Sequence, residues 1–168
     1  MTSTIGGYSH ESVRIRTVWH PSAMSLRSAQ ATDAPSITRV FQAARDHSLA
    51  FLPKLHTDQE DHAFYAKVVE RERVTVAEAD GAVVAFLALD GDEIDHLYVD
   101  PAHHRQGLGT ALLADAKAQR EHLELWVFQR NRNAIAFYEA HGFAIVASTD
   151  GADNEEREPD HRMAWSLR

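Results

Sequence analysis

The sequence predicts a single domain of the layered α/β (α+β) class, in which about four helices flank a mixed, mostly antiparallel sheet of six to seven strands. Two observations carry this prediction. Segments rich in β-branched residues alternate with longer segments whose apolar residues recur at helical spacing. Two hairpin signals, Asp80-Gly81 and Asp90-Gly91, join three consecutive strands into an antiparallel meander. A chain of 168 residues, 44% of them hydrophobic, suits one domain with its own core.

Two helices are predicted ahead of the meander. The first begins at residues 32–35, Thr-Asp-Ala-Pro, because Thr or Asp can cap a helix and Pro is tolerated in its first turn. Its predicted inward face comprises Ile37, Val40, Phe41 and Ala44. The second begins at residues 57–60, Thr-Asp-Gln-Glu, which form a capping box. Its predicted inward face comprises Phe64, Val68 and Val69.

The other elements follow from the same patterns. A first strand is predicted to open at Met24, and the three strands of the meander are residues 73–77, 83–89 and 93–99. After them we expect a helix at 107–119, a strand at 123–128, a helix at 131–141 closed by Gly142, and strands at 143–148 and 162–167. An acidic loop at 150–160 joins the last two strands. Residues 1–23 are polar, with at most a short strand at 13–18, so we expect a loose N-terminal extension to a domain at 24–168.

Composition excludes several classes of function. No apolar run approaches the roughly 18 residues of a membrane-spanning helix, and the N-terminus lacks the pattern of a signal peptide, so we expect a cytoplasmic protein without a membrane partner. The absence of cysteine rules out disulfides and a cysteine nucleophile. The net charge of −8 argues against a nucleic-acid partner and suits a cationic small molecule or peptide amine, although solubility is the commoner meaning of such a charge.

Residues 97–113 carry the strongest functional signal. An apolar strand that reaches Val99 is ended by Pro101, which cannot donate to a strand ladder. A basic turn follows, and Gly107-Leu108-Gly109 then opens a helix. The first amides of a helix have no internal partner and carry the positive end of the helix dipole, so this strand–turn–helix order is typical of a phosphate-binding site. Glycines let a phosphate approach the backbone without meeting a Cβ.

The residues of this turn distinguish among phosphate-binding families. The dinucleotide fingerprint Gly-x-Gly-x-x-Gly fails at Leu112, and the triphosphate loop fails because no Lys precedes Thr110. Residues 104–109, His-Arg-Gln-Gly-Leu-Gly, instead resemble the acetyl-coenzyme A (acetyl-CoA) motif of the GNAT superfamily of N-acetyltransferases, Gln/Arg-x-x-Gly-x-Gly/Ala after a strand ending in Val-x-Pro. His104 replaces the usual Gln or Arg, which weakens one side-chain contact and leaves the backbone cradle.

A second stretch, residues 131–143, resembles the other half of the GNAT signature, Asn-x-x-Ala-x-x-Phe-Tyr-x-x-x-Gly-Phe. The two motifs occur in the family's order and separation, so the resemblance covers residues 24–168 and implies the GNAT fold. It implies that Tyr138 protonates the departing thiolate of coenzyme A, and a tyrosine hydroxyl, with a reference pKa of about 10, is a donor at neutral pH. Asn131 is implied to contact the pantetheine arm and can also cap its helix. Phe137 is interpreted as core.

The resemblance implies acetyl-CoA as co-substrate and no metal. Its pyrophosphate would lie on the amides of residues 105–110, and the backbone of the preceding strand would bond the pantetheine amides and polarise the thioester carbonyl. The implied cofactor-binding residues are Leu97, Tyr98, Val99, His104, Arg105, Gln106, Gly107, Leu108, Gly109, Thr110 and Asn131. None of the 11 histidines has the spacing of a zinc enzyme.

The general base is less clearly marked. Some members of the family place a Glu four residues before the position of Leu97, which is Glu93 here. Asp95 and His96 compete with it, and His96 has the most suitable unperturbed pKa, about 6.5. Strand alternation predicts that Glu93 and Asp95 share a face with Leu97, with His96 on the other face. Glu93 is slightly favoured over His96, and each can equally be a residue that only forms ion pairs or lines the pocket.

The sequence therefore predicts an acyltransferase, an N-acetyltransferase that moves the acetyl group of acetyl-CoA to a primary amine of a small molecule or peptide by direct attack in a ternary complex. The acidic loop, with Glu155 and Glu156, could attract such an amine or be merely solvated. The family also favours a homodimer. The competing hypotheses are a catalytically silent acyl-CoA-binding or regulatory module, and a protein-interaction domain that uses residues 1–23.

Overall fold

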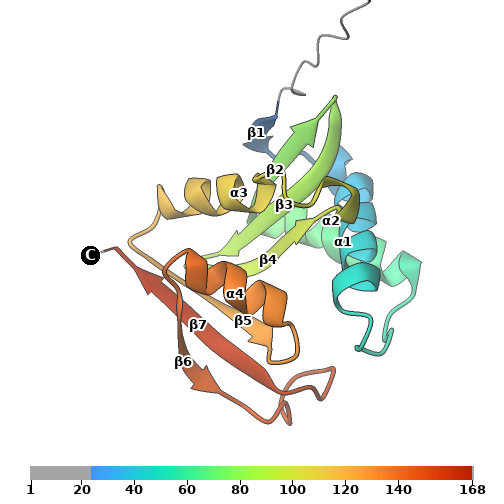
Figure 1. Cartoon of the computed structure of the whole chain (residues 1–168). Helices are drawn as coiled ribbons and strands as arrows, with labels where there is room; N and C mark the ends of the chain where they lie inside the picture. Colours follow the sequence, from blue (N-terminus) through green and yellow to red (C-terminus); the bar gives the residue numbers. More distant parts are fainter. Residues whose placement is uncertain (1–23, 168) are drawn as a thin grey trace, which may run out of the picture.

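Seven strands form one sheet in the order β1-β2-β3-β4-β5-β7-β6 (Figure 1), in a computed structural model that describes residues 24–167. The strands are β1 Ser25–Ser28, β2 Arg73–Ala79, β3 Ala82–Asp90, β4 Glu93–Val99, β5 His122–Phe128, β6 Ala144–Ser148 and β7 Asp160–Ser166. The helices are α1 Ala34–Ser48, α2 Asp58–Arg71, α3 Leu108–Lys117 and α4 Arg132–Ala140, with short 3-10 helices at Ala31–Asp33 and Pro101–His103. The predicted fold class, strand number and helix number are confirmed, whereas the predicted extension at 1–23 lies outside the described residues.

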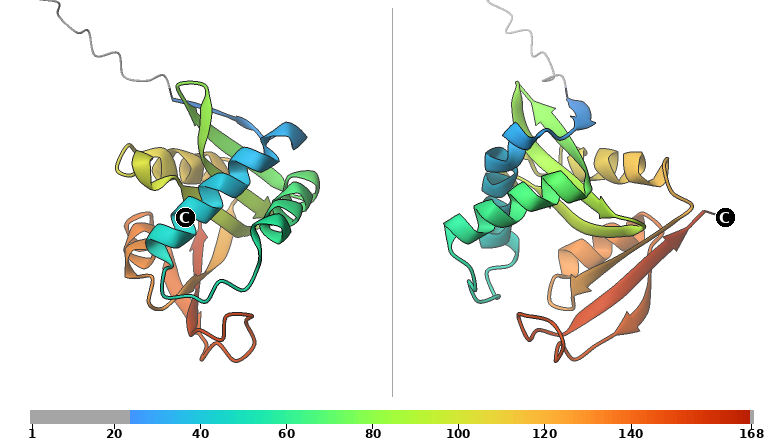
Figure 2. Two further views of the ribbon diagram at one scale, coloured as in Figure 1. Left: turned by 90° about the vertical axis from the view of Figure 1, so that its right-hand side faces the viewer. Right: turned by 180° about the vertical axis from the view of Figure 1, so that it is seen from behind.

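The helices cover the two faces of the sheet in pairs (Figures 1 and 2). On one face, Ile37 and Val40 of α1 and Tyr65 of α2 pack against Phe86 and its neighbours on the meander. On the other face, the apolar side of α3 and Tyr138 of α4 pack against the opposite side of the same strands. The middle of β3 is consequently buried on both faces, as in the central strand of a three-layer domain.

β4 and β5 are parallel neighbours that pair only at their beginnings. The one residue pair recorded between them is Glu93 with Glu124, next to a hydrogen bond from Glu124 N–H to Asp92 O (3.0 Å). Beyond that point the two strands diverge (Figure 1). β5 continues the sheet through antiparallel pairing with β7, and β7 pairs with β6. The sheet therefore opens between β4 and β5, toward the ends of both strands.

Local details of both predicted N-terminal helices differ from the expectation. Asp33 occupies the N-cap position of α1, but its carboxylate accepts from Arg27 (2.7 and 2.9 Å) and from Gln30 N–H (2.7 Å), not from the amides of α1. The capping box of Thr57 and Glu60 at α2 is confirmed. Phe64, predicted inward, is 49% exposed, because α2 is rotated so that Tyr65, 2% exposed, meets the sheet.

The meander also departs from its predicted register. Asp90 pairs with Glu93, so the two-residue turn is Gly91-Asp92 and begins one residue later than predicted. A bulge then follows in β4, where the partners of β3 pass from Ile94 to His96 and Asp95 is left unpaired. The bulge breaks the predicted alternation: Ile94, and not Glu93, shares the α3 side of the sheet with Leu97. His96 lies on the other face, as predicted.

The loop between β6 and β7 requires glycine at position 151, and this requirement can be tested by mutation. The φ of Gly151 is +79°, and a Cβ there would lie 2.4 Å from the backbone carbonyl of Glu158. We expect Gly151→Ala to lower the free energy of unfolding by about 2–4 kcal/mol, the combined cost of a left-handed backbone and a backbone clash. Gly91→Ala is the matched control, because Gly91 also has a positive φ (+60°) but open space around it. Equal urea midpoints for the two variants would contradict the steric argument.

Candidate active site

Two adjoining cavities lie where β4 and β5 separate. The larger, an open cleft of about 640 Å³, runs from the C-terminal end of α1 across the end of β4 to the N-terminus of α3 and along α4. The smaller, about 110 Å³, lies between β4 and β5 themselves. Six residues border both cavities: Leu49, Leu97, Tyr98, Asn131, Ala134 and Tyr138. The two spaces therefore meet at the gap in the sheet.

The structure gathers nearly all of the sequence-predicted cofactor residues around the larger cleft. The residues that line it are Leu97, Tyr98, Val99, His104, Arg105, Gly107, Leu108, Gly109, Thr110 and Asn131. Gln106, the remaining one, is exposed in the same turn but does not line the cleft. The residues predicted from short motifs come from three separate segments of the sequence, and the fold brings them together around one cleft.

The N-terminus of α3 presents free backbone donors to this cleft. Gly107 is the N-cap in the left-handed conformation (φ +80°), and Arg105 two residues earlier is left-handed as well (φ +62°). The first helical hydrogen bond runs from Ala111 N–H to Gly107 O (2.9 Å). The amides of residues 108–110 therefore have no backbone acceptor in the described part of the chain, which is the arrangement that binds phosphate.

Glycine stands at positions 107 and 109 of this turn for different structural reasons. A Cβ at Gly107 would meet nothing within 4 Å, so the space in front of the turn is open. A Cβ at Gly109 would lie 3.3 Å from the ring of Phe137, a tight contact, so Gly109 lets α3 and α4 approach closely without displacing that ring. Phe137 therefore packs against the turn, in agreement with its interpretation as core.

Tyr138 borders both cavities and is 8% exposed. Its ring packs against Phe137 (5.3 Å between centroids) and Phe143 (5.5 Å). Burial raises the pKa of its hydroxyl well above the usual value, so the group keeps its proton at neutral pH. No hydrogen bond of this hydroxyl is recorded within residues 24–167, so its proton is available to a molecule in the cavities.

Asn131 has two compatible tasks at the start of α4. Its side-chain oxygen accepts from Ala134 N–H (3.3 Å) as the N-cap of the helix. The same residue borders both cavities. Capping holds the side chain at the cavity wall, where its amide nitrogen can still donate to a ligand.

His104, the residue that departs from the family pattern, is bound to the preceding strand. Its Nε2 lies 3.2 Å from Val99 O, which accepts, so Nε2 carries a proton. The ring of His47, at the end of α1, contacts the ring of His104 at 5.4 Å between centroids. This pair joins α1 to the turn before α3, so His104 helps to shape the cleft wall.

The two candidate bases predicted on β4 lie away from both cavities. Glu93 is at the closed end of the gap, where burial, Asp95 and Glu124 raise the pKa of its carboxyl. His96 packs among aromatic rings on the α2 side, with ring centroids 5.6 Å from Phe64 and 5.2 Å from Tyr65. Neither residue is among those that line the two cavities described above.

Asp95 is the β4 carboxylate that lines the smaller cavity. Its Oδ2 lies 3.2 Å from His96 Nε2, and this contact with His96 holds the pKa of Asp95 below its usual value despite burial. Alternation alone could not single out Asp95, because its position depends on the bulge, which residue spacing does not reveal.

Glu72, at the end of α2, is a titratable neighbour of Asp95 that the sequence analysis did not identify. Burial, together with the charge of Asp95, raises the pKa of Glu72 to about 6. Its Oε2 is buried and has no hydrogen-bond donor in the described part of the chain. The negative charge of Asp95 thus favours the protonated form of Glu72.

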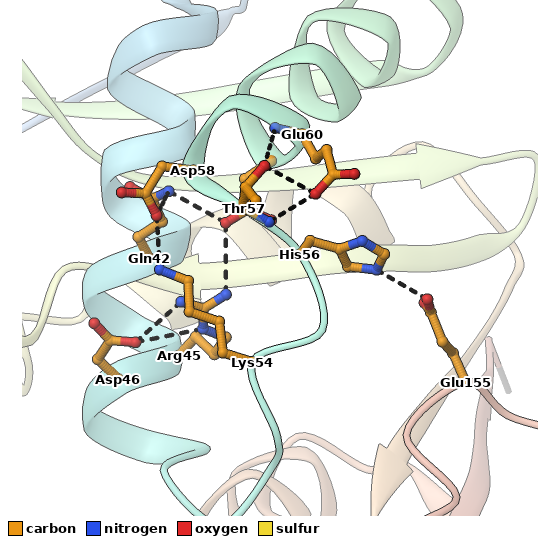
Figure 3. A network of polar contacts seen from close by, with 10 residues as sticks. Gln42, Arg45, Asp46, Lys54, His56, Thr57, Asp58, Glu60 and Glu155 are labelled. Carbon is orange, nitrogen blue, oxygen red and sulfur yellow. Dashed lines mark hydrogen bonds and ion pairs between the residues drawn. The ribbon is translucent and has the colours of Figure 1, made fainter.

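The loop between α1 and α2 is held by a network of polar contacts (Figure 3). Lys54 donates to Asp58 (2.7 Å), and Gln42 of α1 reaches the same carboxylate (3.3 Å), so the loop is tied to both helices. His56 forms an ion pair with Glu155 of the β6–β7 loop (3.0 Å), and this contact raises the pKa of His56. Two loops far apart in sequence are thereby joined.

Residues 24–167 contain neither a cluster of metal-ligating side chains nor a helix that could span a membrane. No group of three or more His, Asp or Glu residues within them is arranged to hold a metal ion. No helix among them combines the length and the apolar character needed to span a bilayer.

Comparison with known proteins supports the resemblance to one family. Residues 70–145, which contain the meander, the phosphate-binding turn and α4, match the family "Acetyltransferase (GNAT) domain". The whole fold superposes on the solution structure of apo-form YjaB from Escherichia coli with a TM-score of 0.74 at 21% identity, covering 87% of this chain and 99% of YjaB. Residues 70–145 thus match a GNAT acetyltransferase domain, and the described chain has the fold of GNAT acetyltransferases, which together support a GNAT-superfamily acetyltransferase.

Two other acetyltransferases are similar to this chain. The peptidyl-lysine N-acetyltransferase YiaC of Escherichia coli (strain K12) is 37% identical over 94 residues, which are 55% of this chain and 62% of YiaC. This chain thus spans about three fifths of YiaC's length. The structure of yncA from Salmonella typhimurium with its cofactor acetyl-CoA has a TM-score of 0.65 at 23% identity, and covers 88% of this chain and 95% of yncA.

Proposed function

We propose that this protein transfers the acetyl group of acetyl-CoA to a primary amine, with a lysine side chain of a peptide or protein as the favoured acceptor and a small-molecule amine as the other. The observation that carries the proposal is the position of Tyr138, which borders both the cleft beside the free amides of α3 and the cavity that contains Asp95. The name of YiaC, a peptidyl-lysine N-acetyltransferase, supports the choice of acceptor.

The residues around the cleft fit the parts of coenzyme A. The open space before Gly107 and the free amides of residues 108–110 suit its pyrophosphate. Beyond Glu93 no strand partner of β4 is recorded on the side that faces β5, so backbone groups near Leu97 are free to bond the pantetheine amides. Bound there, acetyl-CoA would supply an activated thioester.

The chain then contributes a proton donor and oriented dipoles. Tyr138, kept protonated by burial, donates to the departing sulfur. Backbone N–H groups of β4 near Leu97 stabilise the negative charge that develops on the carbonyl oxygen. The chain has no cysteine, which excludes an acyl-cysteine intermediate, and in this proposal the amine attacks the thioester directly in a ternary complex.

The acceptor amine needs a carboxylate and must lose a proton. The pKa of an alkylammonium is about 10.4, roughly 3.4 units above neutral pH. Its deprotonation at pH 7 therefore costs about 4.6 kcal/mol. We assign the recognition of the ammonium to Asp95, with Glu72 as the group beside it that can accept a proton. Glu93 and His96, the bases that the sequence suggested, act through Asp95 in this scheme.

Asp95→Asn is expected to reduce kcat/KM for the amine by about 10- to 100-fold, the loss of one charge-assisted hydrogen bond, and to leave acetyl-CoA affinity unchanged. Glu93→Gln is the comparison variant. Urea unfolding checks that both variants are as stable as the wild type. A larger loss in Glu93→Gln than in Asp95→Asn would return the role to Glu93.

The proposed function is tested by release of free thiol from acetyl-CoA in the presence of an amine panel. The panel contains lysine peptides, peptides with a free N-terminus, polyamines and aminoglycosides. We expect turnover above background with at least one lysine peptide. A protein that binds acetyl-CoA but releases no thiol with any amine would be the silent binding module, and one that binds no coenzyme A would lack the proposed function.

A further inference from the structure

Thr110 and His141 form a hydrogen-bonded pair at the wall of the larger cleft. Thr110 is the third residue of α3, next to the free amides, and lines the cleft. Its Oγ1 lies 3.1 Å from Nε2 of His141, the residue that ends α4. The other ring nitrogen of His141, Nδ1, lies 2.7 Å from Phe137 O, and the ring packs on Phe137 at 4.4 Å between centroids.

These two contacts determine where the protons lie. A backbone carbonyl can only accept, so Nδ1 of His141 carries a hydrogen in every state that keeps this contact. In the neutral ring Nε2 then has no hydrogen, so it accepts and Thr110 donates to it. In the protonated ring Nε2 also carries a hydrogen, so His141 donates and Thr110 accepts.

The direction of this bond decides what Thr110 offers to the cleft. While its only hydroxyl hydrogen points at His141, Thr110 presents lone pairs to the cleft, which repel an anion. Once His141 is protonated, the hydroxyl hydrogen is free to turn outward and donate to a phosphoryl oxygen. The imidazolium also adds one positive charge beside the N-terminus of α3.

We propose that His141 is a positioning residue for the diphosphate of coenzyme A: its protonation turns the Thr110 hydroxyl toward the phosphate, so binding of coenzyme A takes up one proton. The inference rests on the proposed function for the presence of coenzyme A in the cleft. By linkage, an anion that favours the imidazolium is itself bound more tightly as the pH falls.

The charged side chain that contacts His141 from α3 is Lys117. Its Nζ donates to His141 O and lies over the ring of Trp165 from β7, at 4.6 Å from the centroid. This contact uses the backbone of His141 and is present whichever nitrogen of the ring is protonated. The ring itself meets Phe137 of α4 and Thr110 of α3.

The test is calorimetric titration with dephospho-coenzyme A, in pairs of buffers whose ionisation enthalpies differ. Dephospho-coenzyme A keeps the diphosphate but lacks the terminal phosphate monoester, whose own ionisation near pH 6 would add to the proton balance. We expect wild-type protein to take up a proton on binding and to lose affinity about fivefold or more between about pH 6 and pH 8, within the limit of about tenfold per pH unit for one proton.

Four single variants and one double variant separate this pair from the other groups of the cleft. Thr110→Val and His141→Gln are each expected to abolish the coupled proton uptake, and the double variant to bind like the weaker single variant. Thr110→Ser keeps a hydroxyl and is expected to restore the uptake. His161→Gln, on β7 beside Ser148, is the control for a histidine outside the cleft and is expected to behave as wild type.

The outcomes are distinguishable from those that test the proposed function. Absence of any binding of dephospho-coenzyme A and of coenzyme A by the wild type would contradict the proposed function. Binding with equal proton uptake in wild type, Thr110→Val and His141→Gln would overturn the inference while leaving that function intact. Uptake that survives in Thr110→Val but not in His141→Gln would mean that His141 acts through its charge alone, and would overturn the role of Thr110.

Discussion

Replacement of Tyr138 by phenylalanine is expected to lower kcat by about 100-fold or more, the usual contribution of a general acid, while acetyl-CoA affinity stays within about twofold. The ring fills the junction of the two cavities and packs against Phe137 and Phe143, contacts that phenylalanine keeps. Only the hydroxyl is lost, and no hydrogen bond of that hydroxyl is recorded within residues 24–167. The effect should therefore be on chemistry and not on folding.

Initial rates of thiol release and calorimetric titration with coenzyme A measure the two quantities separately. Tyr98→Phe is the matched control, because Tyr98 borders the same two cavities from β4 and burial raises the pKa of its hydroxyl to about 12. Its ring belongs to the α1 and α2 side of the sheet, where it contacts Phe41 and Phe86. A Tyr138→Phe enzyme with the kcat of the wild type would refute the acid role of Tyr138.

Replacement of Gly107 by aspartate is expected to weaken coenzyme A binding at least about 100-fold. Two charge-assisted hydrogen bonds at about 1.5–3 kcal/mol each would be lost or strained, and each 1.4 kcal/mol is a factor of ten. The new carboxylate would occupy the open space before the turn, where the pyrophosphate is proposed to bind, and would repel it. Calorimetry measures the affinity directly.

Gly81→Asp controls for the backbone cost of this change. Gly81 has nearly the same φ, +77° against +80° for Gly107, and open space around it, but it lies in the β2–β3 hairpin. Aspartate tolerates the left-handed region better than most residues, so both variants should fold. If Gly81→Asp weakened binding as much as Gly107→Asp, the loss would report general destabilisation and the phosphate assignment would fail.

The features that the sequence predicted well are those determined by neighbouring residues. The capping box at Thr57, the turn at Asp80-Gly81 and the N-cap Asn131 each depend on a few consecutive positions. The glycine turn before α3 is local in the same sense, because the free amides of residues 108–110 come from consecutive positions, and its binding of phosphate stays a prediction. Such features can be predicted with no knowledge of how the elements pack.

The sequence-based predictions were less accurate where tertiary packing determines which side chains are buried or line a cavity. Phe64 and Tyr65 are adjacent aromatic residues, and only the contact of Tyr65 with Phe41 and Phe86 determines which of them is buried. The bulge at Asp95 moved the cavity carboxylate away from the position that strand alternation assigned to Glu93.

Glu72 could not have been found in the sequence at all. It ends α2 as an ordinary helix-terminal glutamate, and its unusual pKa exists only because α2 folds its last residue against β4. A titratable group of this kind has no local pattern, since burial and a charged neighbour are both properties of the tertiary fold.

The single pairing of Glu93 with Glu124 has a consequence for where the two substrates can bind. Residues of both helix layers border the smaller cavity, since Tyr98 packs with the α1 and α2 layer and Tyr138 with the α3 and α4 layer. In the proposed reaction, coenzyme A beside the N-terminus of α3 and the amine beside Asp95 would therefore occupy different parts of the site and meet at Tyr138.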